Sequence, residues 1–246
     1  MKQTTVFGVR MAVGTREELF LLVKERLFSG GAVATVNATM LDRARRDADV
    51  RRTLSSMLSI PDGVGVRLVL RARGIQTEVL PGVELGRLLL SSGAITVGLY
   101  GGRSGVAEGA MAVLLRDNPR LRPAFALDGY SVDERELCAA LERTSPDVLC
   151  IALGSPRQEK LAARLRVLYP TMLSLGLGGS LDVWSGRLRR APRLFRSLGL
   201  EWLWRMLRQP RRLLGVPSLC RFLFFGFWEG TLSGKSRKRG ENTPPP

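Results

Sequence analysis

Short apolar runs, several of them rich in β-branched residues, recur along this chain, and helical patterns separate them. The runs that predict buried strands lie at residues 32–37, 94–102, 122–128, 147–154 and 172–179. The helical patterns lie at residues 15–28, 40–58, 106–117, 133–143 and 156–169, and a capping box of Thr15 and Glu18 opens the first. Strand–turn–helix units at this spacing predict an α/β fold, a Rossmann-like parallel sheet flanked by helices on both faces.

Positive charge is concentrated in the last quarter of the chain. Residues 185–246 hold 14 Lys and Arg against three Glu, a net charge of +11, so residues 1–184 carry only +5 of the total +16. A basic excess indicates an anionic partner, which leaves nucleic acid, an anionic bilayer and a phosphorylated small molecule open. A genome biased toward Arg is an alternative explanation of the basic excess, since only 5 of the 38 basic residues are Lys. Such a bias would raise the Arg content of the whole chain and would not concentrate Arg in the last quarter.

The same quarter is also apolar and aromatic. Trp, Leu and Arg alternate after Arg187, and a 16-residue apolar run at 213–228 is interrupted by Pro217 and Arg221. A spanning helix needs about 20 apolar residues, so we expect this run to form a surface patch for a partner or a membrane, or to fold back on the core. We therefore divide the chain into an α/β domain at 1–195, a basic amphipathic C-terminal appendage at 196–232 and a disordered tail at 233–246.

The composition excludes several kinds of chemistry. The chain has no His, which removes His-based acid/base catalysis, Ser-His-Asp triads and His-ligated zinc. Its three Cys are widely spaced and unpaired in pattern, which indicates buried thiols in a reduced cytosolic setting, and the N-terminus lacks the apolar core of a signal peptide. The only Asp-x-Asp string, Asp47-Ala48-Asp49, falls inside a predicted helix, so we expect a solvated face and no metal site.

Polar residues and glycines follow the predicted strands. They are Thr35 and Asn37, Asp62 in a Pro-Asp-Gly turn, Gly101 and Gly102, Gln158 in the segment that opens a helix, and Asp182. Each alone is also typical of an ordinary turn or helix cap. Because the carboxyl ends of parallel strands meet at one edge, where α/β sheets bind ligands, we expect these residues to gather at a site for an anionic ligand.

Five segments in order from residue 33 to residue 212 resemble the WecG/TagA/CpsF glycosyltransferase family. They read VATVNATMLDRARRD, IPDGVGV, LYGGRSGVAEGA, ALGSPRQEK and GLGGSLDVWSGRLRRAPRLFRSLGLEWLWRMLRQPRR. The resemblance implies a UDP-sugar-dependent hexosyltransferase that needs no metal and no cofactor. It would move an N-acetylmannosamine-type sugar or a related hexose to a polyprenyl-diphosphate-linked sugar, in cell-envelope or exopolysaccharide synthesis. The enzyme would lie peripherally on the anionic cytoplasmic face of the membrane and bind no nucleic acid.

The resemblance also implies residue roles. Asp62 matches the aspartate expected to act as general base, since a carboxylate near the acceptor hydroxyl can take its proton as the glycosidic bond forms. Arg205 and Arg212 match appendage arginines that cover the active site and neutralise the departing diphosphate. Thr35 is expected to be a further catalytic residue that contacts the sugar. The remaining matches are expected to bind substrate: Asn37 at the sugar, Gln158 and Asp182 near the nucleotide, and Gly101, Gly102 and Tyr130 elsewhere in the site.

On one continuous helix Arg205, Arg208 and Arg212 would share a stripe, apart from an apolar stripe at Leu200, Leu203, Trp204 and Leu207. Pro210 can break that line. Fixed guanidinium groups are a substitute for a cation at a diphosphate.

The chain departs from the family pattern at four positions, which bear on substrate and activity more than on fold. Val79 and Glu84 stand where relatives carry Arg and Asp, Asp128 replaces the His of His-Gly-Tyr, and Gly215 stands at a basic position. The alternative function is a non-catalytic basic α/β protein that binds anionic lipid or nucleic acid. The pairing of basic and aromatic residues favours a bilayer for such a protein, and liposome sedimentation against a gel shift would discriminate.

Overall fold

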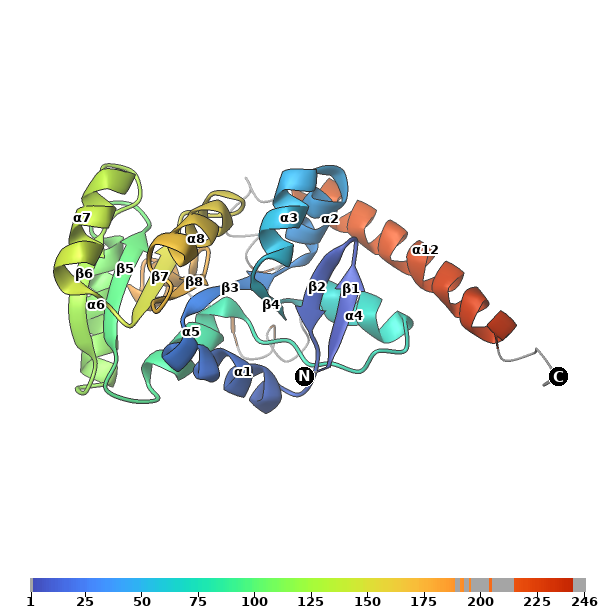
Figure 1. Ribbon diagram of the computed structural model, residues 1–246, viewed down its shortest axis with the longest axis horizontal. Helices are drawn as coiled ribbons and strands as arrows, with labels where there is room; N and C mark the ends of the chain where they lie inside the picture. The colour runs from blue at the N-terminus through green and yellow to red at the C-terminus, as the bar shows by residue number, and fades with distance from the viewer. Residues whose placement is uncertain (1, 189–190, 193–194, 196–203, 205–214, 241–246) are drawn as a thin grey trace.

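The computed structural model describes residues 2–188, 191–192, 195, 204 and 215–240, and Figure 1 shows its architecture. The strands are β1 (Gln3–Val6), β2 (Val9–Ala12), β3 (Gly31–Val36), β4 (Leu58–Pro61), β5 (Thr96–Gly101), β6 (Arg122–Leu127), β7 (Val148–Ala152) and β8 (Leu173–Gly176). The helices are α1 (Arg16–Ser29), α2 (Ala38–Arg46), α3 (Ala48–Ser55), α4 (Val64–Ala72), α5 (Gly82–Leu90), α6 (Val106–Asp117), α7 (Glu134–Thr144), α8 (Arg157–Leu168), α9 (Ser180–Trp184) and α12 (Val216–Gly240).

A six-stranded parallel sheet in the order β4-β3-β8-β7-β5-β6 forms the centre, which confirms the predicted α/β class. The predicted strands appear as β3, β5, β6, β7 and β8. The antiparallel β1–β2 hairpin and strand β4 were not anticipated from the sequence.

Helices cover both faces of the sheet, as buried side chains that alternate along β3 demonstrate. Ala32, Ala34 and Val36 lie in a core with side chains of α2, α3, α4, α7 and α8, while Val33 lies in a second core with α1, α5, α6 and α9. Side chains on the two faces of β3 thus pack in two separate apolar cores. This is the packing expected of a doubly covered parallel sheet.

The helix expected at residues 40–58 is two helices, so that prediction is wrong in its length. Asp47 adopts an extended backbone and its side chain accepts from the N–H groups of Asp49 and Val50 at 2.9 and 3.2 Å. An aspartate that satisfies two free amides of a helix start is an N-cap. Asp47 therefore ends α2 and begins α3, whereas the capping box of Thr15 and Glu18 opens α1 as predicted.

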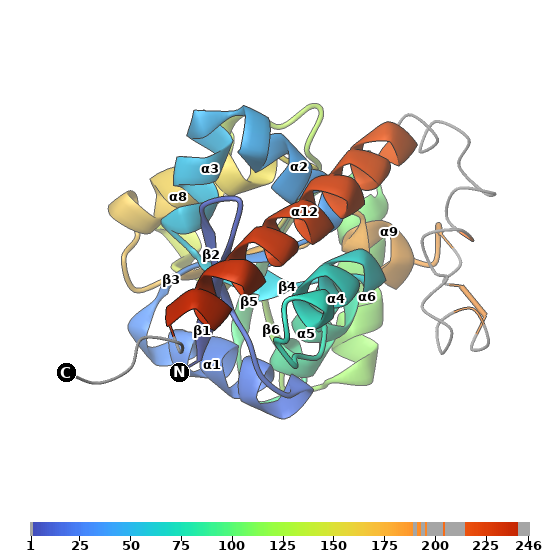
Figure 2. The ribbon, with the colours of Figure 1, turned by 90° about the vertical axis from the view of Figure 1, so that its right-hand side faces the viewer.

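The last helix, α12, packs across α2 and α4 and then projects beyond the sheet (Figures 1 and 2). Phe222 is completely buried in the first core, with an edge-on ring contact to Phe7. An added Cβ at Gly226 would lie 2.7 Å from a methyl group of Val69, so α12 and α4 approach closely there. The helix continues to Gly240, whereas the sequence predicted a disordered tail from residue 233. The prolines of that predicted tail, which would stop a helix, begin only at residue 244.

Candidate active site

The connections of the sheet reverse direction between β5 and β7, which are neighbours in the sheet. From β5 the chain passes through α6 to β6, and α6 packs in the second core; from β7 it passes through α8 to β8, and α8 packs in the first core. Neighbouring strands whose connections leave in opposite directions form a topological switch point, where α/β proteins bind ligands.

Gly101 and Gly102 line this switch point. Gly102 donates its N–H to the carbonyl of Ala152 at 3.1 Å, and its own carbonyl accepts from Gly129 at 3.0 Å. An added Cβ at Gly101 would overlap the carbonyl group of Ala152, so only glycine allows the loop after β5 to lie this close to β7. The sequence placed these glycines correctly at the end of a strand.

Three predicted site residues lie together at the carboxyl ends of β3 and β4. The two strands pair with Val36 opposite Pro61, and the ladder continues one step because Asp62 donates its N–H to Val36 at 2.9 Å. Thr35 is 7 % exposed, and its hydroxyl donates to the carbonyl of Gly176 on β8 at 3.2 Å. Asn37 caps α2 by accepting from the N–H of Met40 at 3.1 Å. The structure therefore groups Thr35, Asn37 and Asp62 at one end of the edge.

Gln158 lies between these two groups. Its side-chain oxygen accepts from the N–H groups of Gly154 and Gly178 at 3.2 and 3.0 Å, and the side chain is 4 % exposed. Asp182 lies on α9, directly after β8, and is half-buried. Both residues thus follow the two central strands, as the sequence predicted.

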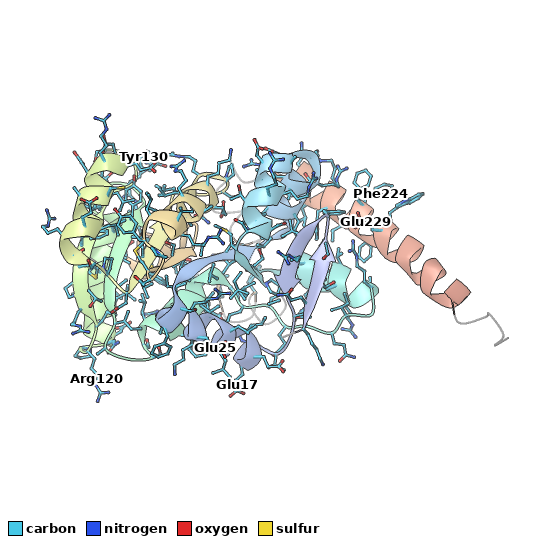
Figure 3. The ribbon with its side chains drawn as sticks, in the orientation of Figure 1. Glu17, Glu25, Arg120, Tyr130, Phe224 and Glu229 are labelled. Atoms are coloured by element: carbon cyan, nitrogen blue, oxygen red, sulfur yellow. The ribbon has the colours of Figure 1, made fainter. Side chains whose placement is uncertain are left out.

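Tyr130 lies at the end of the sheet opposite to Asp62. It follows β6, whereas Asp62 follows β4, and five interstrand spacings of roughly 4.8 Å separate those strands by about 24 Å. Its side chain is 77 % exposed and points outward in Figure 3. The structure therefore does not bring Tyr130 together with Asp62.

Two of the four departures from the family pattern have local partners. Asp128 accepts from the N–H groups of Tyr130 and Ser131 at 2.9 and 2.8 Å. Hydrogen bonds from the Ser131 side chain and from these two amides hold the pKa of Asp128 below its usual range. Glu84 on α5 forms an ion pair with Arg16 on α1. These two acids thus serve a turn and a helix–helix contact.

Among the residues that the structure describes, the other two departures have no hydrogen bond or ion pair of this kind. Val79 is half-buried before α5. An added side chain at Gly215 would meet no described atom within 4 Å. The predicted catalytic arginines, Arg205 and Arg212, lie outside the described residues.

Two residues near the site were missed by the sequence reasoning. Glu159 is 2 % exposed and accepts from the Gln158 amide nitrogen at 2.7 Å, and burial raises its pKa. Arg43 on α2 donates to the carbonyl of Ser155 at 3.0 Å, across 112 residues. Glu159 resembles an ordinary exposed acid in a first helical turn, and Arg43 one of several surface arginines, so neither gave a signal.

Within the described part of the chain, no helix is long and apolar enough to cross a membrane. The same residues contain no group of three or more Cys, Asp or Glu side chains arranged to hold a metal ion.

Comparison with known proteins identifies the family. The family model described as glycosyl transferase WecG/TagA/CpsF matches residues 4–235. The chain is 33 % identical over 197 residues to an N-acetylglucosaminyldiphosphoundecaprenol N-acetyl-beta-D-mannosaminyltransferase of Bacillus subtilis, over 77 % of each chain. It is 34 % identical over 198 residues to the enzyme of the same name from Bacillus spizizenii, again over 77 % of each. With the parallel sheet and the matched segments, these findings confirm the resemblance: the chain belongs to the WecG/TagA/CpsF family of glycosyltransferases.

Proposed function

We propose that this glycosyltransferase moves an N-acetylmannosamine-type sugar, or a related hexose, from a UDP-sugar to a sugar linked to polyprenyl diphosphate. The names of both relatives support the acceptor and the transferred sugar. The observation that carries the proposal is the placement of Asp62 beside Thr35 and Asn37, at the ligand-binding edge of the sheet. The alternative of a non-catalytic binding protein gains no support, because both relatives are named as transferases.

Asp62 is the proposed general base. It accepts the proton of the acceptor hydroxyl while that oxygen bonds to the anomeric carbon of the donor sugar, and the bond from that carbon to the diphosphate breaks with UDP as leaving group. Thr35 and Asn37 are proposed to contact the sugar, because they share the end of the edge with Asp62. This transfer needs no redox step and no cofactor.

The nucleotide is proposed to lie toward the switch point. Gly101 and Gly102 offer a close backbone approach there, and Gln158 and Asp182 follow the central strands between the switch point and Asp62. Arg205 and Arg212 are proposed to neutralise the diphosphate as its charge grows, which replaces a metal ion by guanidinium groups. Tyr130 would contact only a part of the substrate that lies beside β6, the outer strand of the sheet.

The appendage is proposed to hold the enzyme peripherally on the inner, anionic face of the membrane. Phe224, Phe227 and Trp228 of α12 are 62, 42 and 58 % exposed, and the rings of Phe224 and Trp228 stack with centroids 6.3 Å apart. Figure 3 shows Phe224 pointing away from the body of the protein. An exposed aromatic stripe within a segment of +11 net charge is suited to an anionic lipid surface.

The test is a panel of UDP-sugars, screened for protection against thermal unfolding and then for transfer to a soluble acceptor that carries N-acetylglucosamine on a lipid diphosphate. We expect one UDP-sugar to raise the Tm and to be consumed only when the acceptor is present. Transfer that requires added divalent metal, or no transfer from any UDP-sugar, would refute the proposal.

A further inference from the structure

One side-chain atom fastens two loops of the candidate active site together. The Oε1 atom of Gln158 accepts from Gly154, in the loop after β7, and from Gly178, in the loop after β8. These strands are neighbours in the sheet, with Ile151 opposite Gly176. The spacing of the two loops therefore depends on where this oxygen lies.

The carboxamide of Gln158 can do this in only one orientation. Rotated by half a turn, it would present its amide nitrogen, a donor, to two further donors. Glu159 selects the correct orientation, because its Oε1 accepts from the Gln158 Nε2 at 2.7 Å. In the rotated form two oxygens would face each other at this contact.

Burial makes this selection strong. Gln158 and Glu159 are 4 and 2 % exposed, so water does not compete for their hydrogen bonds. A buried carboxyl group is costly to keep, and burial accordingly raises the pKa of Glu159. The acid is thus held at a position where an apolar side chain would be easier to accommodate.

The Gln158 side chain also lies close to the part of the sheet that positions Thr35. An added Cβ at Gly176 would lie 3.2 Å from the Gln158 Nε2, so the amide lies directly over the last residue of β8. The carbonyl of Gly176 accepts the hydroxyl of Thr35 at 3.2 Å. On the other side, the loop after β7 is held by Arg43 through the Ser155 carbonyl. Gln158 thus joins the switch-point loop to the strand that supports Thr35.

We propose that Glu159 is a positioning residue. It orients the Gln158 carboxamide, and through it aligns the loops after β7 and β8 for the diphosphate-bearing donor; the choice of ligand rests on the function proposed above. Neither side chain needs to touch the donor for this role. Loss of the orientation weakens donor binding and raises KM more than it lowers kcat.

The test compares Glu159→Gln, which keeps an acceptor oxygen, with Glu159→Met, which keeps the length but removes it. Amide hydrogen exchange is measured at Gly154 and Gly178, with the β7 amide of Leu149 as internal reference and UDP as the binding probe. For Glu159→Met we expect exchange at both glycines to rise about tenfold, as for loss of one hydrogen bond of ordinary net strength, with Leu149 unchanged and UDP binding weakened. Glu159→Gln should stay within about twofold of the wild type in both readouts.

Glu136→Met, which removes an exposed first-turn acid from α7, is the matched control and should change neither readout. If Glu159→Met does not fold, Gln158→Met carries the same expectation for the two glycine amides. Unchanged exchange at Gly154 and Gly178, or a rise shared equally by Leu149, would overturn the positioning role. Failure of the wild type to bind UDP would instead refute the proposed function, and the exchange comparison would still decide the role of Glu159.

Discussion

Arg221 on α12 donates from both Nε and Nη2 to a single carboxylate oxygen of Asp42 on α2, at 3.3 and 3.0 Å. Asp42 is completely buried, and Arg46 and Arg45 on its own helix lie 3.0 and 3.7 Å from its oxygens. The two partners are 179 residues apart in the chain. This contact ties the last helix to the helix that Asn37 caps at the candidate active site.

The Asp42–Arg221 contact should stabilise the fold. Arg221→Met removes two charge-assisted bonds to a buried carboxylate, and we expect the free energy of unfolding to fall by about 1.5–3 kcal/mol. Chemical denaturation measures it, with Arg71→Met on the exposed face of α4 as control, which should change stability by no more than about 0.5 kcal/mol. A double-mutant cycle with Asp42→Asn that shows no coupling would contradict the account.

The same contact predicts a pH dependence. Burial alone would raise the pKa of Asp42, but hydrogen bonds from Arg221 and Ser218 and the charge of Arg46 outweigh it, so the pKa lies below its usual value of 3.8. A lowered pKa stabilises the fold above the unfolded-state value, and that contribution is lost as the pH falls through the folded-state value. Urea unfolding from pH 6 to pH 3 should therefore show a steeper loss of stability for the wild type than for Asp42→Asn. Parallel curves would refute the contribution of Asp42.

Phe222 and Phe224 should behave in opposite ways. Phe222→Ala empties a buried site in the first core and should cost about 3–5 kcal/mol of stability. Phe224→Ala removes a largely exposed ring and should change stability by no more than about 0.5 kcal/mol, yet weaken binding to phosphatidylglycerol vesicles. Thermal unfolding and vesicle sedimentation separate the two effects. Full vesicle binding by Phe224→Ala would show that this aromatic stripe does not contact the membrane.

Removal of α12 should damage the core. A chain that ends at residue 215 loses the Phe222 side chain from the first core and the Arg221 partner of buried Asp42. We expect a lower Tm and exposed apolar surface, measured by calorimetry and dye binding. A truncated protein as stable as the full chain would contradict the packing of α12 described above.

Sequence periodicity predicted the sheet because β3, β5 and β7 contain β-branched residues and each of these strands leads into a turn. The grouping of Thr35, Asn37 and Asp62 could be predicted because residues at the carboxyl ends of parallel strands meet by topology alone. Contacts between distant segments could not: nothing around Asp42 indicates a partner at Arg221, and nothing in a first-turn Glu159 indicates burial. The α2–α3 boundary was missed because Asp47 acts through backbone amides, which a helical hydrophobic pattern does not report.

The most direct test of the account is the turnover of Asp62→Asn with a UDP-sugar and a soluble lipid-diphosphate acceptor. The substitution keeps the size of the side chain and removes the proton acceptor, so turnover should fall by about 10²–10⁴-fold while UDP still binds. Asp49→Asn, at an exposed aspartate paired with Arg52 on α3, is the matched control and should keep full turnover. Near-normal turnover of Asp62→Asn would contradict the central claim that this carboxylate is the general base.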